Sequence, residues 1–267
     1  MRRTIALFTT MVLTLLVATS VAMAAVISCP TGLNGTCRGT ASADTMTGTA
    51  QRDIIDSFRG RDTLDARRAD DSLNGGQGDD SLNGGQDNDD LIGGQDNDSL
   101  DGGLGNDEYL FQDDWGVDTI TGDASGIDIL DFSKLTQSVT VRNNSAKTST
   151  SPDASTLTWG PTVLFEGIRG GAGRDILNGT DNVATYLDGA AGSDFLTGGN
   201  SNDTLVGGAG PDFFAGGSGD DTINAADRET DSLVVCGAGF DTVLYDRTRD
   251  FPDQFRDCEK KVEVRLS

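Results

Sequence analysis

Residues 75–110 read GGQGDDSLN, GGQDNDDLI, GGQDNDSLD and GGLGNDEYL, four consecutive units of one pattern, GGxGxDxUx, in which U is a large apolar residue. A fixed period this short is typical of a solenoid whose unit is one tight turn plus one short strand. The acid at the sixth position returns in every unit. We therefore predict an all-β solenoid in which metal ions complete each layer.

The same frame extends beyond these four units. It runs without a break from Gly39 to Leu110 as eight units, although the early units lack the paired glycines, and it returns in a second block from Gly170 to Asn224. One ten-residue unit, GTDNVATYLD, interrupts the second block. Side chains alternate between the faces of a strand, so the eighth position is predicted to point inward. In the first block that position holds Met46, Ile55, Leu64, Leu73, Leu82, Leu91, Leu100 and Tyr109.

The first six positions, GGxGxD, are predicted to form the turn, leaving xUx as the strand. Glycine suits positions that need a positive φ, and Asn and Asp are the next best tolerated there. We expect that role for Asp87 and Asp96 at the fourth position, and for Asn88, Asn97, Asn106 and Asn202 at the fifth.

The recurring acids predict calcium sites. Two units make one coil of 18 residues, so acids 18 apart become neighbours at the usual strand spacing of about 4.8 Å. Stacked carboxylates repel one another, and calcium, which accepts six to eight oxygen ligands in flexible geometry, removes that cost better than magnesium does. In the units of Asp44 and Asp53 threonine replaces the second glycine, which disfavours a metal there. The predicted pairs are Asp62 with Asp80, Asp71 with Asp89, Asp80 with Asp98, Asp89 with Asp107, Asp194 with Asp212, and Asp203 with Asp221.

On these residues the chain resembles the haemolysin-type calcium-binding, or RTX, repeat proteins, whose nonapeptide GGQGDDSLN matches at every defined position. The resemblance implies a parallel β-roll that holds several calcium ions per chain through turn aspartates and turn carbonyls and folds on export. Relatives often carry a protease, lipase or pore-forming domain, and none is visible here. The predicted metal-site residues are Asp62, Asp71, Asp80, Asp89, Asp98, Asp107, Asp194, Asp203, Asp212 and Asp221, with the turn glycines Gly75, Gly76, Gly78, Gly84, Gly85, Gly93 and Gly94.

The chain is predicted to be secreted. Two arginines precede an apolar run that ends in the small-x-small sequence Ala22-Met23-Ala24, which indicates a cleavable signal peptide; the alternative is a permanent membrane anchor. After cleavage no membrane span is expected. The predicted organisation is a signal peptide (1–24), an N-terminal cap (25–38), the first calcium-binding block (39–110), a β-rich spacer (111–169), the second block (170–224), and a degenerate repeat with a C-terminal cap (225–267).

The four cysteines allow three disulfide pairings in an oxidising compartment. Cys29 and Cys37 lie 8 residues apart and Cys236 and Cys258 lie 22 apart, whereas any cross-pairing closes a far longer loop. Loop-closure entropy favours the two local pairs. Each is predicted to staple one end of the solenoid.

The spacer is predicted to contain two strands, at 138–142 and 156–159, because apolar and polar residues alternate there. The intervening NNSAKTSTSPDAS, residues 143–155, is typical of an exposed loop. Two interpretations of the spacer's aromatic residues remain, a ligand groove or buried packing over the edge of the roll. These residues are Phe111, Trp115, Phe132, Trp159 and Phe165.

Composition excludes several functions. The net charge is −23, which disfavours nucleic acid as a partner because phosphate binding needs clustered cations. The chain has no histidine, so zinc proteases of the HExxH type and Ser-His-Asp or Cys-His mechanisms are excluded, and we predict no enzyme. A glycosidase is compatible with the many carboxylates, but these follow the repeat period. A disordered acidic tract is the alternative to a fold, and it does not explain the strict apolar position.

We expect an extracellular, calcium-dependent structural or adhesive protein of the cell surface or matrix. The alternative is an accessory or targeting module of a secreted hydrolase or a polysaccharide-active enzyme, and a weaker one is an enzyme sited in residues 111–169. Besides calcium ions, the expected partners are cell-surface polysaccharide or another secreted protein.

Overall fold

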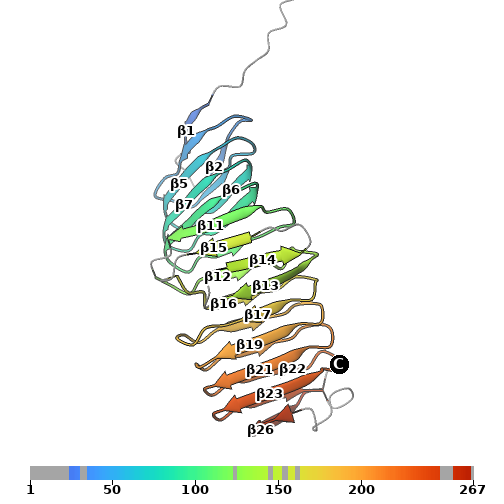
Figure 1. Ribbon diagram of the computed structural model, residues 1–267. Coiled ribbons are helices and arrows are strands. Elements are labelled where there is room, and N and C mark those ends of the chain that lie inside the picture. Colours follow the sequence, from blue (N-terminus) through green and yellow to red (C-terminus); the bar gives the residue numbers. More distant parts are fainter. Residues whose placement is uncertain are drawn as a thin grey trace, which may run out of the picture.

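The computed structural model describes residues 24–30, 35–122, 125–143, 147–151, 156–159, 163–246 and 255–265. The described strands stack along one axis as two facing sheets, and successive coils pass from one sheet to the other (Figure 1). The fold is the all-β solenoid that the repeat predicted, and the described residues include no helix. In particular, no helix among them is suited to crossing a membrane.

Sheet A has 14 strands in the spatial order β1 (Val26–Ser28), β3 (Thr45–Thr47), β5 (Thr63–Arg68), β7 (Ser81–Gln86), β9 (Ser99–Leu104), β11 (Val117–Gly122), β15 (Thr156–Trp159), β14 (Lys147–Ser151), β13 (Ser138–Arg142), β17 (Ile176–Asn178), β19 (Phe195–Gly199), β21 (Phe213–Ser218), β23 (Leu233–Ala238) and β25 (Phe255–Arg256). Sheet B has 12 strands in the order β2 (Gly35–Arg38), β4 (Asp53–Asp56), β6 (Ser72–Gln77), β8 (Asp90–Gln95), β10 (Glu108–Leu110), β12 (Ile129–Asp131), β16 (Gly167–Arg169), β18 (Tyr186–Asp188), β20 (Thr204–Val206), β22 (Thr222–Ala225), β24 (Thr242–Tyr245) and β26 (Lys260–Glu263).

The register confirms the 18-residue coil. In sheet A Leu64 pairs with Leu82 and Leu82 with Leu100, and in sheet B Leu73 pairs with Leu91. All eight predicted inward positions of the first block are 0–1% exposed. The core of the repeat blocks is therefore a ladder of single apolar side chains between the sheets, with leucine stacked on leucine in the central layers.

The strands of the central block are longer than predicted. β6, for example, continues past xUx through Gly75 and Gly76 to Gln77, so only the last three positions of GGxGxD make the turn. The second glycine bends the strand, because Gly76 has φ +100°, a left-handed conformation that other residues adopt only with strain. The prediction of a six-residue turn is wrong because a strand built on this glycine pair can keep its ladder hydrogen bonds while curving.

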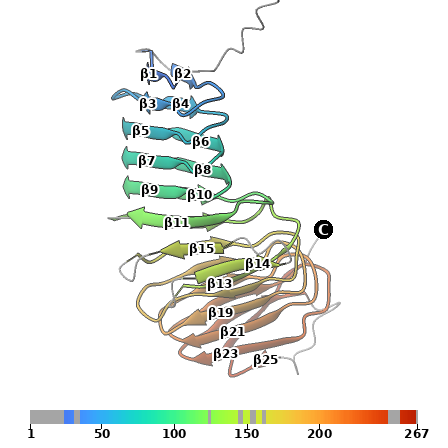
Figure 2. The same cartoon turned by 45° about the horizontal axis from the view of Figure 1, so that its top comes forward.

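The spacer continues both sheets instead of standing apart. The two predicted strands are present as β13 and β15, but the predicted loop between them is wrong in part: it contains β14, which pairs antiparallel with both. Residues 144–146 and 152–155 of that loop lie outside the described residues. In sheet B, β12 pairs directly and in parallel with β16. Figure 2 shows β13, β14 and β15 between the first block and the second.

The spacer's aromatic side chains pack in the interior. Phe111 stacks on Phe132 with ring centroids 4.8 Å apart, and Trp115 lies 4.8 Å from Phe111. Trp159 meets Phe165 edge to face at 5.4 Å. These five side chains are at most 5% exposed, so the alternative of an aromatic ligand groove in the spacer is wrong. Large rings in mutual contact fill the core of the irregular coils.

Two disulfides lie near the ends of the solenoid, with the predicted pairing. Cys29 bonds Cys37, joining the end of β1 to β2 across the two sheets. Cys236 in β23 bonds Cys258, which lies between β25 and β26. The signal-peptide prediction falls on residues 1–24, of which 1–23 lie outside the described residues.

Candidate metal centre

The sixth-position aspartates lie inside the solenoid, at the edge where each turn enters its strand. Because the side chain two residues before an inward apolar residue also points inward, each aspartate is buried next to the core ladder. Alternate units place them in two columns, one before the strands of sheet A and one before those of sheet B. The column residues are Asp44, Asp62, Asp80, Asp98, Asp118, Asp175, Asp194, Asp212 and Asp231 for sheet A, and Asp53, Asp71, Asp89, Asp107, Asp128, Asp203, Asp221 and Asp241 for sheet B, all at most 3% exposed.

Within a column each carboxylate contacts the preceding coil. The main-chain N–H of Asp71 donates to Asp89 Oδ1 at 2.8 Å, and that of Asp89 donates to Asp107 Oδ1 at 2.9 Å. The same bond joins the other predicted pairs, namely Asp62 with Asp80, Asp80 with Asp98, Asp194 with Asp212, and Asp203 with Asp221. All six predicted pairs are therefore neighbours.

The second carboxylate oxygen of most of these aspartates has no hydrogen-bond partner. Each such Oδ2 is buried, and a buried unpaired carboxylate oxygen is costly because no water replaces the lost solvation. The unpartnered Oδ2 recurs at the same position in successive coils, so it is a property of the repeat and not of one layer. The buried, unpartnered Oδ2 atoms include those of Asp62, Asp71, Asp80, Asp89, Asp98, Asp107, Asp118, Asp194, Asp203, Asp212, Asp221 and Asp241.

The carboxyl pKa values record this cost. Burial raises the pKa of Asp89 from 3.8 to about 8, with the neighbouring Asp107 and Asp71 charges adding to the shift. Burial likewise raises the pKa of Asp80 and of Asp98 to about 7. In the second block it raises the pKa of Asp194 to about 7. Without a cation, the buried carboxyls of a column therefore favour their protonated form near neutral pH. A bound cation would favour the ionised form instead.

The first glycine of each unit makes room for the carboxylate. Gly84 is not in the left-handed region; a Cβ there would overlap the Asp89 carboxylate, and the same holds for Gly75 with Asp80 and Gly93 with Asp98. The paired glycines thus have separate duties. The first leaves space for an acid five residues later, and the second allows the backbone to bend.

The early units satisfy the Oδ2 atoms of their acids differently. Asp44 Oδ2 accepts the N–H of Thr40 at 2.6 Å, and Oδ1 accepts the Thr40 hydroxyl at 3.1 Å and the Ala25 N–H at 2.8 Å. In the next unit Thr49 donates its N–H and hydroxyl to Asp53 Oδ2. In both units the main-chain N–H of the threonine at the second position bonds Oδ2, so that oxygen already has a partner without a cation.

The fifth-position asparagines do not adopt a positive φ, so that part of the turn prediction is wrong, whereas Asp87 and Asp96 do, at +74° and +79°. Their amides bond between layers instead. Asn88 Oδ1 accepts the N–H of Asn106 at 2.8 Å, and Asn97 Oδ1 accepts that of Val117 at 3.1 Å. Asparagine is favoured at this position because its side chain joins stacked turns.

Sequence reasoning missed acids in the irregular coils. Asp118 Oδ1 accepts the N–H of Asp98, Asp231 Oδ1 that of Asp212, and Asp241 Oδ1 that of Asp221, each at 2.8–2.9 Å. Asp128 bonds Asp107 in the same way. The glycine pair is lost before these acids, but the acid followed by an alternating apolar strand persists, as in Asp118-Thr119-Ile120, and that signal could have found them.

The donor set fits a hard divalent cation. Among the residues that the structure describes, no three His, Cys, Asp or Glu side chains gather closely enough to hold a metal. An ion in a column therefore would meet one or two carboxylates and complete its shell with main-chain carbonyls. Calcium accepts such mixed oxygen sets, whereas soft or imidazole-seeking metals do not favour them.

These features define a parallel β-solenoid whose edges carry columns of buried, unpartnered carboxylate oxygens, which is the class of calcium-binding β-rolls. The family model of the RTX calcium-binding nonapeptide repeat matches residues 38–73, 57–91, 74–109, 168–182 and 188–223. The chain thus carries RTX calcium-binding nonapeptide repeats, as its sequence predicted. A comparison with curated proteins gave no match.

Replacing Asp89 by asparagine tests the column, with Asp44→Asn as the matched control. Without calcium at about pH 5, where protonation is expected to keep the chain folded, Asp89→Asn is expected to raise the free energy of unfolding by about 1–3 kcal/mol, because a buried carboxyl no longer has to be protonated; in calcium at neutral pH it should lower the free energy of unfolding, because a ligand is lost. Asp44→Asn should destabilise the fold under both conditions, since Asp44 is already fully bonded. Urea unfolding followed by circular dichroism measures both. The same sign for Asp89→Asn with and without calcium would contradict a metal role for this acid.

Proposed function

We propose that this calcium-binding protein is a secreted structural component that folds when calcium binds between its stacked turns, and that it serves adhesion at a cell surface or in an extracellular matrix. The observation that carries the proposal is the repeated buried, unpartnered Oδ2 in both columns. The ligands would be the ten predicted aspartates together with carbonyls of the turn glycines Gly75, Gly76, Gly78, Gly84, Gly85, Gly93 and Gly94.

The thin core supports a structural role that depends on the ion. Each strand in the repeat blocks contributes one large apolar side chain to the interior, so hydrophobic burial per residue is small and the carboxylates subtract from it. Ion binding to the folded state alone adds stability in proportion to the logarithm of its concentration. Calcium outside cells is abundant enough to keep such a roll folded.

Two features support an extracellular location. The two disulfides persist best in an oxidising compartment. The N-terminal sequence has the features of a secretory signal. We also infer that the chain is not an enzyme, because its acids follow the repeat period and it contains no histidine.

Two measurements on the native source and the purified chain test this proposal. The protein is expected in the medium or on the cell surface and to be released by a chelator wash but not by a wash with magnesium. Metal analysis after gel filtration should find several calcium ions per chain. Recovery from the cytoplasm, or a folded chain free of calcium, would contradict it.

A further inference from the structure

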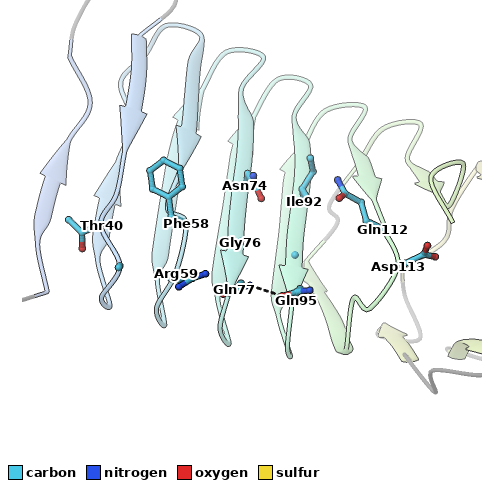
Figure 3. Close-up of a pocket in the computed structure, with 12 residues that line it drawn as sticks. Thr40, Phe58, Arg59, Asn74, Gly76, Gln77, Ile92, Gln95, Gln112 and Asp113 are labelled. Atoms are coloured by element: carbon cyan, nitrogen blue, oxygen red, sulfur yellow. Dashed lines mark hydrogen bonds between the residues drawn. The ribbon is translucent and has the colours of Figure 1, made fainter. Parts of the chain in front are cut away.

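A groove runs along the edge of sheet B in the first block, with a volume of about 620 Å³. It is lined by the second and third positions of five successive units on the sheet B edge, from Thr40 and Ala41 to Gln112 and Asp113, and by Asn74 and Ile92 at the ninth position (Figure 3). Four layer steps of about 4.8 Å give it a length of about 19 Å along the solenoid axis. A site of this length suits a linear polymer more than a single small molecule.

The floor and walls of the groove differ in chemistry. Gly76 and Gly94 leave the floor without side chains, and the walls carry the amides of Asn74, Gln77 and Gln95. Gln77 Nε2 donates to Gln95 Oε1 at 2.9 Å, which leaves an acceptor on Gln77 and donors on Gln95. A row of amides that both donate and accept hydrogen bonds suits a ligand rich in hydroxyl groups, because a hydroxyl also donates and accepts.

Phe58 stands in the groove at the second repeat position, which is glycine in each of the four central units. Its φ is +71°, which is strained for an aromatic residue, and it is 42% exposed. Core packing does not explain this choice, because Phe58 belongs neither to the buried core nor to the partly buried residues packed against it. An exposed ring beside a row of amides offers an apolar face to a ligand whose edges are polar.

Charge and strand pairing narrow the ligand class. Arg59 and Asp113 balance each other within the groove, while the chain as a whole carries −23, so an anionic polymer gains nothing and is repelled overall. A peptide cannot add to the sheet here, because β4, β6 and β8 are each paired on both sides. A neutral polymer with hydroxylated edges and apolar ring faces is not repelled by the negative chain and needs no free strand edge.

We propose that this groove binds a neutral, linear polysaccharide, with Phe58 stacked on a sugar ring and Asn74, Gln77 and Gln95 bonded to its hydroxyls. This deepens the proposed adhesive function by naming the partner class, and it rests on the calcium-dependent fold because the groove spans five stacked coils.

Affinity electrophoresis of the calcium-loaded full chain tests the proposal, with hydroxyethyl cellulose, galactomannan and dextran as neutral polymers and polygalacturonate as the acidic one. At least one neutral polymer is expected to retard the chain. Phe58→Gly should weaken retardation about tenfold, a typical effect of losing a binding aromatic residue, while leaving stability equal or higher because it relieves the strained φ. Arg67→Gly, at the same repeat position on the other edge with φ +83°, should leave retardation unchanged.

Several outcomes would overturn the proposal. These are retardation by polygalacturonate alone, no retardation by any neutral polymer while circular dichroism shows the calcium-folded chain, or retardation that Phe58→Gly leaves unchanged. A dimer in gel filtration that Phe58→Gly dissociates would assign the groove to a second copy of the chain. Loss of the folded spectrum in calcium would instead count against the proposed function.

Discussion

Chelation of calcium at about pH 7.5 is expected to abolish most of the β-structure of this chain, and calcium at roughly 0.1–1 mM, typical of extracellular modules, to restore it. The expected change is large because the same ions act in many layers. Without them the sixth-position carboxylates from Asp62 to Asp241 that lack an Oδ2 partner are buried beside one apolar side chain per strand. The core cannot offset that many desolvated charges.

Far-UV circular dichroism during a calcium titration measures this transition, and the same titration with magnesium is the control. Magnesium demands stricter octahedral geometry and holds its water more firmly, so it should restore little structure at equal concentration. A spectrum that is already β-rich in chelator and does not change on adding calcium would refute calcium-dependent folding.

Acidification in chelator is expected to restore β-structure that neutral pH abolishes. The folded-state pKa values of Asp89, Asp118 and Asp80 are raised to about 8, 8 and 7 from an ordinary value of 3.8. Between about pH 4 and pH 8 the folded chain therefore binds more protons than the unfolded chain. The free energy of unfolding falls as pH rises through this window, and the stabilisation is complete only below it.

Calcium should reverse this dependence. A calcium ligand must be deprotonated, so protons compete with the ion and the calcium midpoint should shift to higher concentration as pH falls. Circular dichroism across the window, in chelator and in excess calcium, measures both slopes, and sedimentation checks that acid has not caused aggregation. Stability that rises with pH in chelator would show that these carboxylates are not the controlling groups.

The period alone predicted the coil, its register and the six aspartate pairs. With one inward apolar position in every nine residues, that position stacks on its equivalent 18 residues later, and this fixes the register of the strands. Two strands of the spacer, β13 and β15, also followed from alternation, whereas β11, β12 and β16 were not predicted. β14 was not predicted either, because its sequence of Lys, Thr and Ser carries no apolar alternation and its pairing comes from β13 and β15 on either side. Tertiary context outweighed local composition there.

The function of individual turn residues was harder to predict. The two glycines of a pair are indistinguishable in the sequence, yet only Gly76 of Gly75 and Gly76 needs a positive φ. The duty of Gly75 depends on where the Asp80 carboxylate lies. The acids of the irregular coils were missed for a different reason. One to three extra residues per coil break the 18-residue spacing there, although the buried position still belongs to the acid and the apolar residue that follows.

The antiparallel strand β14 has a consequence for cooperativity. In the sheet A column the bonds between carboxylates and the preceding coil end at Asp118 and begin again where Asp175 accepts the N–H of Val139. In sheet B the series passes from Asp128 to Glu166, and Thr185 stands where the next acid is expected. In a linear array order spreads only between nearest neighbours. The chain should thus behave as two foldons, so that a damaged layer melts its own block and leaves the other standing.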